Sequence, residues 1–282
     1  MQVEGRVIIC DTIDDTGISI LKKAGLVVDY KPDIEFDELV ASVGDCDVIV
    51  VRSRTKITKT IIDAASKVKI VARVGVGLDN IDTNYAQSRG IKVLNAAEAA
   101  MNAVSELVIG HMLALSRNIP KANDGIKSGR WLKKELVGSE LKGKYLGIVG
   151  VGNIGRNVGR LARCFRMNLI GYDIFPINQD YVREVGMIKT DLKTLLENSD
   201  FVTCHVPLTE NTRHLINSET LSYMKPTAFL INTSRGEIID EESLFGALSE
   251  NRIAGAALDV FEVEPPTNTK LLHLRNIVCS PH

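Results

Sequence analysis

Short apolar runs rich in β-branched residues recur along the chain and alternate with segments whose apolar residues have helical spacing. In the first third of the chain these runs are VIIC (7–10), VVDY (27–30), VIVV (48–51), IVAR (70–73) and KVLN (92–95). They are apolar throughout rather than alternating, which is typical of strands buried on both faces. This alternation of strand and helix predicts a parallel sheet with helices on both of its faces.

A second series of apolar runs begins near position 146 and is again interrupted by helical segments. Its members are LGIVG (146–150), LIGYD (169–173), FVTCHV (201–206), FLINT (229–233), AALDV (256–260) and NIVCS (276–280). Between the two series, residues 104–116 form a strongly apolar candidate helix. We interpret this helix as the bridge between two α/β domains, 1–97 and 98–282, each built on a doubly wound parallel sheet.

Charge and composition argue against several classes of partner. With 45% hydrophobic and 24% charged residues and a net charge of -1, the chain is an ordinary globular protein without an evident basic face. We therefore predict no nucleic-acid or membrane partner. The five cysteines include no C-x-x-C pair, and Cys10, Cys204 and Cys279 stand in apolar runs, so we expect buried thiols in the cytoplasm. The histidines lack zinc-type spacing, and no metal site is predicted.

Three glycines after an apolar run form the sharpest local motif, G-x-G-x-x-G at Gly150, Gly152 and Gly155. The first glycine allows a tight turn, the second lets the backbone approach a pyrophosphate, and the third permits close packing of helix on strand. The phosphates would face the N-terminus of the following helix, where free N–H groups favour negative charge. The helix begins with Asn153, Ile154 and Arg156 around the third glycine, and the arginine could add a countercharge.

The next apolar run ends in Asp173. An acid at this place accepts hydrogen bonds from the ribose hydroxyls of a dinucleotide and repels a 2′-phosphate. Ile174, Phe175 and Pro176 follow, and none of them could neutralise such a phosphate. The pattern therefore favours NAD over NADP. The alternative is a structural glycine turn followed by an unrelated surface aspartate.

Polar groups follow three of the later strands, at residues 233–236 (TSRG), 259–266 (DVFEVEPP) and 280–282 (SPH). Together with RSRT (52–55), RVGVGLDNID (73–82), GVGNIG (150–155) and HVPLT (205–209), these segments resemble the D-isomer-specific 2-hydroxyacid dehydrogenases over nearly the whole chain. The resemblance implies a flavodoxin-like substrate-binding domain and a Rossmann NAD-binding domain. It also implies NAD-dependent oxidation of a D-2-hydroxyacid, with 3-phosphoglycerate at the start of serine synthesis as the expected substrate. The alternatives are a glyoxylate, hydroxypyruvate or D-lactate enzyme, and an NADH-sensing scaffold or corepressor.

The resemblance assigns the catalytic roles to three residues. Arg235 would hold the substrate carboxylate and keto oxygen with its planar guanidinium. Glu264 would hold the imidazole of His282, and His282 would take the hydroxyl proton as hydride leaves C2. Asp259 would orient the nicotinamide amide. The other cofactor contacts implied by the resemblance are His205, Val206, Pro207, Thr212, Thr233 and Ser234.

In the first domain, the resemblance makes Arg52, Ser53, Val76 and Gly77 the substrate-binding residues, with the backbone N–H groups of the last two receiving the carboxylate. Arg52, Arg54 and Lys56 together would suit a phosphorylated substrate, although a solvated basic turn is an equal alternative. The segment 95–106 departs from the family because alanine stands at Ala97 and Ala100 and methionine at Met101, where the family has proline and polar residues.

Two further expectations concern the ends of the second domain. Family members continue past the histidine into a helix that returns to the first domain, so we expect this chain to be part of a longer one. Residues 104–135 match the family's dimerisation arm, which implies a homodimer or a dimer of dimers, with Trp131 as a natural anchor. The alternative places Trp131 in a domain core.

Overall fold

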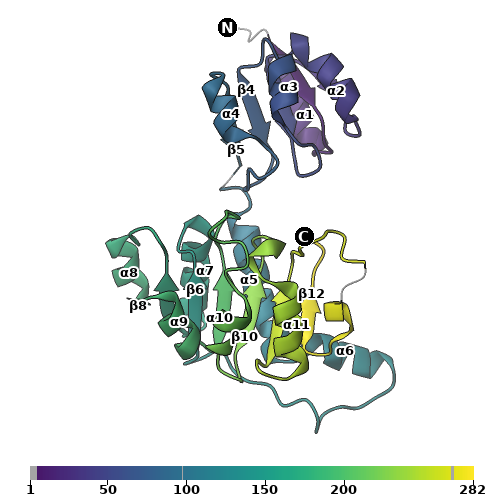
Figure 1. Cartoon of the computed structure of the whole chain (residues 1–282). Helices are drawn as coiled ribbons and strands as arrows, with labels where there is room; N and C mark the ends of the chain where they lie inside the picture. Colours follow the sequence, from purple (N-terminus) through teal and green to yellow (C-terminus); the bar gives the residue numbers. More distant parts are fainter. Residues whose placement is uncertain (1–4, 97, 268–269) are drawn as a thin grey trace. The chain divides into compact units, whose positions relative to one another are not determined.

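The computed structural model describes residues 5–96, 98–267 and 270–282. Their contacts divide the chain into two compact units, Met1–Ala100 and Met101–His282, and each contains its own parallel sheet (Figure 1). Ala97, which ends the first domain in the sequence-based division, lies outside the described residues. In the described part of the chain, no helix has the length and apolar character needed to cross a bilayer.

The smaller unit is a five-stranded parallel sheet in the order β2-β1-β3-β4-β5. Its strands are β1 (Arg6–Ile9), β2 (Val27–Tyr30), β3 (Val48–Val51), β4 (Ile70–Arg73) and β5 (Lys92–Asn95). Its helices are α1 (Asp15–Lys23), α2 (Phe36–Ser42), α3 (Lys59–Ala64) and α4 (Thr83–Ser88), with a 3-10 turn η1 at Val43–Asp45. Ile8 packs in one cluster with Leu39 and Ile61, whereas Val7 packs in another with Ile18 of α1, so the sheet is covered from both sides.

The larger unit is a seven-stranded parallel sheet in the order β12-β11-β10-β9-β6-β7-β8. Its strands are β6 (Tyr145–Val149), β7 (Asn168–Tyr172), β8 (Met187–Lys189), β9 (Phe201–Cys204), β10 (Phe229–Asn232), β11 (Gly255–Leu258) and β12 (Ile277–Cys279). The strand order reverses between β6 and β9, and open α/β sheets bind ligands at the carboxyl ends of strands beside such a reversal. Strand β8 was not predicted, because three residues at a sheet edge carry too little apolar signal.

Helices cover both faces of the larger sheet. They are α5 (Met101–Ser116), α6 (Ile119–Lys127), α7 (Asn153–Cys164), α8 (Gln179–Val185), α9 (Leu192–Asn198), α10 (Ser218–Ser222) and α11 (Glu241–Ser249), with 3-10 turns η2 (Gly236–Ile238) and η3 (Lys270–His273). Met112 of α5 and Val158 of α7 belong to one buried cluster, and Leu195 of α9 and Leu244 of α11 to the other. The predicted fold class, two doubly wound parallel-sheet domains, is confirmed.

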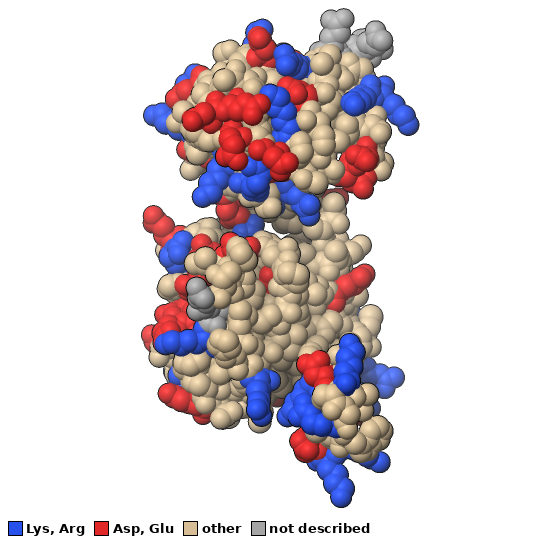
Figure 2. Space-filling model, turned by 90° about the vertical axis from the view of Figure 1, so that its right-hand side faces the viewer, with Lys and Arg blue, Asp and Glu red and all other residues tan. Residues whose placement is uncertain are grey.

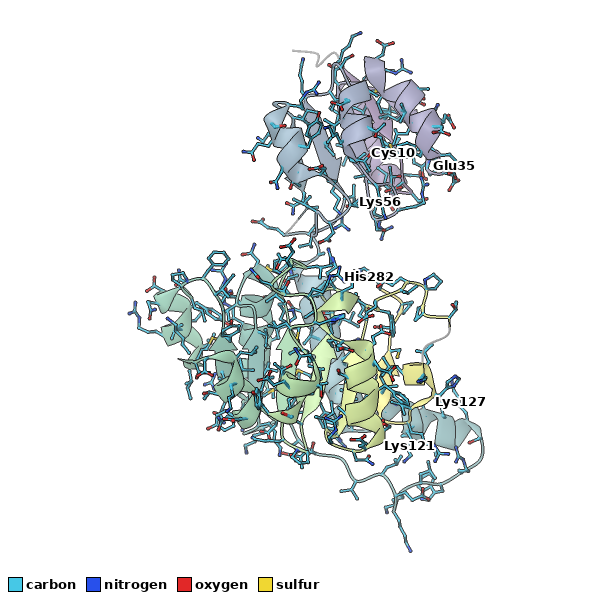
Figure 3. All side chains as sticks on the ribbon, in the orientation of Figure 1. Cys10, Glu35, Lys56, Lys121, Lys127 and His282 are labelled. Atoms are coloured by element: carbon cyan, nitrogen blue, oxygen red, sulfur yellow. The ribbon has the colours of Figure 1, made fainter. Side chains whose placement is uncertain are left out.

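Two expectations about burial need revision. Cys279 is exposed, because β12 is the outermost strand of the larger sheet in the part of the chain that the structure describes. Trp131 is 78% exposed, so the alternative that it fills a domain core is wrong. It lies in the segment after α6, which projects from the body of the larger unit (Figure 1), and Figure 3 labels Lys121 and Lys127 on that helix. On the face shown in Figure 2, acidic and basic side chains are interspersed, in keeping with the net charge.

Candidate active site

The glycine loop joins β6 to the N-terminus of α7. Gly150 has a left-handed φ of 92°, and its N–H donates to the Tyr172 carbonyl at 2.9 Å. A side chain at Gly155 would overlap the Gly150 carbonyl oxygen. At Gly152, in contrast, an added methyl group would meet nothing within 4 Å. Two glycines therefore serve the backbone and helix packing, while the third faces open space at a helix N-terminus, as a pyrophosphate site requires.

This difference predicts opposite outcomes for two alanine substitutions. Gly155→Ala should lower the free energy of unfolding by about 2 kcal/mol or more, because the methyl group has no room against backbone. Gly152→Ala should leave the unfolding temperature nearly unchanged and weaken NADH binding at least about tenfold, since its methyl group would occupy the ligand's approach. Calorimetric unfolding measures the stability of each variant, and titration with NADH measures its affinity for the cofactor. Equal loss of stability in the two variants would contradict this assignment.

Asp173 follows β7 and turns its carboxylate toward the glycine loop. One oxygen accepts from the Val151 N–H at 2.7 Å, and the other accepts from the Phe175 N–H at 2.9 Å. These bonds fix the carboxylate beside the loop and leave lone pairs for ribose hydroxyls. Arg156 lies at the start of α7, where its Nη2 donates to Asn153 Oδ1 at 2.7 Å.

The turn after β9 packs directly against the glycine loop. A methyl group at Gly150 would lie 2.7 Å from the His205 carbonyl oxygen and 2.9 Å from Val206 Cγ1. The Thr212 hydroxyl donates to the Pro207 carbonyl at 2.6 Å and holds the turn. Burial lowers the pKa of His205 to about 4, so its imidazole is neutral at physiological pH. The turn can therefore form an uncharged wall of the cofactor site.

The turn after β10 carries Thr233, Ser234 and Arg235. The buried Asn232 amide organises it, because its oxygen accepts from the Ser234 N–H at 3.1 Å and its nitrogen donates to the Arg235 carbonyl at 2.8 Å. Sequence reasoning overlooked Asn232 because an amide ending a strand has no distinctive pattern. The Thr233 hydroxyl oxygen is buried and has no hydrogen-bond partner in the part of the chain that the structure describes. An orphaned hydroxyl at this sheet edge fits a cofactor contact.

The Arg235 turn lies against the loop that follows β11. A side chain at Gly236 would overlap the backbone of Phe261, so these two loops touch main chain to main chain. The Phe261 N–H in turn donates to Glu264 Oε1 at 3.2 Å. Close backbone packing thus connects the loop that bears the guanidinium to the loop that bears the carboxylate.

Glu264 and His282 form a hydrogen-bonded pair in which His282 Nδ1 lies 2.8 Å from Glu264 Oε2. An ionised carboxylate only accepts hydrogen bonds, so Nδ1 carries the proton and Nε2 of the neutral ring is a free base. The His282 N–H donates to the Asp259 carbonyl at 3.0 Å, which places the residue beyond the carboxyl end of β12 (Figure 3). The pair is partly exposed and open to a small substrate.

In the smaller unit, the predicted substrate residues lie after two adjacent strands. Arg52 and Ser53 follow β3 and are exposed, and Val76 and Gly77 follow β4. The Asn80 amide joins the loops by donating to the Arg52 carbonyl at 3.1 Å. Within residues 5–96 and the other described parts, the N–H groups of Val76 and Gly77 donate to no protein acceptor. They are therefore available to an anionic ligand.

Arg54 has a structural role that the sequence did not reveal. Its Nε lies 3.3 Å from the carboxylate of the buried Asp11, which also accepts from the Arg52 N–H and the Thr55 hydroxyl. The remaining guanidinium nitrogens donate to the carbonyl oxygens of Cys10, Pro32 and Ile34. Of the expected basic trio, Arg52 and Lys56 are therefore the better candidates for a substrate phosphate.

The class of protein follows from this site and from family comparison. Residues 109–282 match the model of the family described as D-isomer specific 2-hydroxyacid dehydrogenase, NAD binding domain. The chain belongs to this family, and the predicted resemblance and the predicted cofactor, NAD, are confirmed. No group of His, Cys, Asp and Glu in the described residues could hold a metal ion.

Two curated relatives are similar to the chain over nearly its whole length. Hydroxypyruvate reductase of Thermotoga maritima is 45% identical over 280 residues, which cover 98% of this chain and 90% of the relative. D-3-phosphoglycerate dehydrogenase of Methanocaldococcus jannaschii is 43% identical over 278 residues, which cover 98% of this chain but 53% of the relative. The chain thus spans about half the length of that phosphoglycerate dehydrogenase.

Solved structures agree with the fold. A glyoxylate reductase from Paecilomyes thermophila superimposes with a TM-score of 0.91 at 28% identity, over 99% of this chain and 88% of that one. D-lactate dehydrogenase from Aquifex aeolicus, complexed with NAD and lactic acid, gives a TM-score of 0.85 at 27% identity, over 98% of this chain and 88% of that one.

Proposed function

We propose that the protein oxidises a D-2-hydroxyacid, with 3-phosphoglycerate as the favoured substrate at the start of serine synthesis. The main observation in support is the 2.8 Å hydrogen bond between His282 and Glu264. This pair lies at the carboxyl ends of the parallel strands, where the Arg235 turn also lies. A base oriented by a carboxylate, next to a guanidinium, is what abstraction of a hydroxyl proton from a carboxylic acid substrate requires.

The chemistry that NAD would supply when bound is acceptance of the hydride from C2 of the substrate. The residues of the chain perform the rest. His282 Nε2 takes the hydroxyl proton as the C2–O bond gains double-bond character, and Glu264 stabilises the imidazolium that results. Arg235 binds the carboxylate and the developing keto oxygen. In the reverse direction, His282 returns the proton to that oxygen.

Residues around the glycine loop would hold the cofactor. Gly152, Asn153, Ile154 and Arg156 would meet the pyrophosphate at the start of α7, and Asp173 would bind the adenosine ribose. The sides of the cofactor site would be formed by Val206, Pro207 and Thr233. Asp259 would contact the nicotinamide. The open space at Gly152 and the orphaned Thr233 hydroxyl support this placement.

The assignment of Asp173 predicts a change in cofactor preference. Asp173→Ala should weaken NADH binding about tenfold and narrow the preference for NADH over NADPH, because it removes the ribose acceptor and the charge that repels a 2′-phosphate. Titration with both reduced cofactors measures the ratio, and Asp180→Ala in α8 is a matched surface control. An unmoved ratio would contradict the ribose role.

Hydroxypyruvate is the second candidate substrate, and the Thermotoga maritima relative favours it through its identity and near-complete coverage. Arg52 and Lys56 support the phosphorylated substrate. Steady-state rates with phosphohydroxypyruvate, hydroxypyruvate, glyoxylate and pyruvate distinguish the candidates. We expect the highest kcat/KM for phosphohydroxypyruvate, and equal values for all four would remove that preference.

We also propose that the protein works as a homodimer or a dimer of dimers in the cytoplasm. The segment around α6 exposes several large apolar side chains, and such a group is typical of a protein–protein interface. They are Ile119, Ile126, Trp131 and Val137. All five cysteines are free, as a reducing compartment requires.

Trp131→Ser should shift the protein toward monomers by at least about tenfold in the dissociation constant, because a buried aromatic anchor contributes strongly to an interface. Sedimentation velocity measures the shift, with the exposed Ile188→Ser on β8 as the control. A dimer that persists unchanged in the tryptophan variant would count against this interface.

A further inference from the structure

A hydrogen-bonded chain of three side chains runs from helix α5 to the strand ends of the larger unit. His111 Nε2 lies 3.0 Å from the Ser280 hydroxyl oxygen, and that hydroxyl lies 2.6 Å from Asp259 Oδ1. His111 and Asp259 are buried, with 4% and 9% of their surfaces exposed. These hydrogen bonds join positions that are far apart in the sequence. The proposed mechanism gives no role to His111 or Ser280.

The direction of each hydrogen bond follows from its chemistry. An ionised carboxylate only accepts, so the single hydrogen of the Ser280 hydroxyl goes to Asp259. The hydroxyl oxygen must then accept from His111, whose Nε2 carries a hydrogen. Burial lowers the pKa of His111, against the opposing effect of the Asp259 charge, so the imidazole is neutral with its proton on Nε2.

The hydrogen bonds of Asp259 give its carboxylate one defined orientation. Its backbone N–H donates to the Asn232 carbonyl at 3.0 Å, and its carbonyl accepts from the His282 N–H at 3.0 Å. Only the side-chain torsion remains, and Ser280 fixes it by binding Oδ1. Asp259 Oδ2 accepts no hydrogen bond from any residue that the structure describes.

We propose that His111 and Ser280 are positioning residues that orient the Asp259 carboxylate toward the carboxamide N–H of the nicotinamide. This inference rests on the proposed function, because it assumes the cofactor role of Asp259. An unanchored carboxylate would rotate among several staggered and flipped states, and only some of them would present an oxygen to the amide. The two residues would therefore act on the nicotinamide end of the cofactor and leave the adenosine end alone.

Calorimetric titration of the full-length protein with three ligands tests this role. NADH carries the amide, ADP-ribose lacks the nicotinamide ring, and reduced 3-acetylpyridine adenine dinucleotide has an acetyl group without an N–H donor. We expect Ser280→Ala and His111→Leu each to weaken NADH about three- to tenfold, the usual effect of one lost hydrogen bond. Affinity for the other two ligands should change less than about twofold, and Ser280→Thr, which keeps the hydroxyl, should restore NADH affinity.

Each other outcome overturns the inference. Equal loss of affinity for NADH and ADP-ribose would mean that His111 and Ser280 only maintain the fold. Unchanged NADH affinity in both variants would mean that the Asp259 carboxylate does not need Ser280 to orient it. A wild-type protein that bound neither NADH nor ADP-ribose would overturn the proposed function as well. Failure of the proposed function can be distinguished from failure of this inference, because it is seen in the wild-type protein before any variant is compared.

Discussion

Replacing Arg235 by alanine should lower kcat/KM for the keto acid about a thousandfold while NADH affinity stays within about twofold. The guanidinium would contact the reacting carboxylate and keto oxygen, and loss of one such donor typically costs two to three orders of magnitude in rate. The proposed cofactor contacts of the same turn would come from Thr233 and Ser234, which the substitution leaves in place. Steady-state kinetics and NADH titration measure the two effects separately.

Arg235→Lys is the matched control for this prediction. Lysine keeps the charge but lacks the planar fork, so it should recover only part of the lost rate. A second control, Arg213→Ala, removes an exposed arginine that pairs with Glu237 in the same unit and should leave kcat/KM nearly unchanged. If Arg235→Ala retained wild-type kcat/KM, the carboxylate-binding role would be refuted.

His282→Gln should reduce kcat by two to four orders of magnitude, the usual contribution of a positioned general base. Glutamine keeps the main-chain N–H that donates to Asp259, and its amide can still reach Glu264, so the loop geometry should survive. Steady-state rates of NADH formation by the wild-type protein and by the variant provide the test.

Glu264→Gln complements the histidine substitution. It keeps the size of the side chain and removes the charge that would stabilise the imidazolium, so we expect a smaller loss of kcat than in His282→Gln. Combining the two substitutions should cost little more than His282→Gln alone, because the pair acts as one unit. Fully additive losses would contradict the pairing.

The sequence predicted the features that depend on local pattern. Most strands were found because they are apolar runs, and the glycine loop was found because its strand, turn and helix are adjacent in sequence. The expectation that every strand is buried on both faces was wrong for β2 and β5, which are the outermost strands of the smaller sheet and have no fully buried residue. Gly150 has the positive φ of a tight turn, Gly155 has the close packing that the motif implies, and Gly152 has the open approach. The family resemblance then assigned roles to residues after β10, β11 and β12, and those roles stay predictions.

Features that depend on distant contacts could not be predicted in this way. Asp11 and Arg54 form a network that fixes the loop after β3, although nothing in the RSRT motif distinguishes the structural arginine from Arg52. His111 lies on an apolar helix, and the sequence alone indicated no partner for it; the fold brings it to Ser280, which is 169 residues away in the chain. Exposure of Trp131 likewise depends on where the segment after α6 runs, which no local pattern specifies.

We propose that the proton-transfer pair and the arginine turn of the larger unit support hydride exchange between NAD and a D-2-hydroxyacid. The most direct measurement is NADH consumption by the full-length protein with a 2-keto acid, followed by chiral analysis of the product. We expect turnover that yields the D-enantiomer alone. Tight NADH binding without turnover of any 2-keto acid, or release of the L-enantiomer, would contradict it.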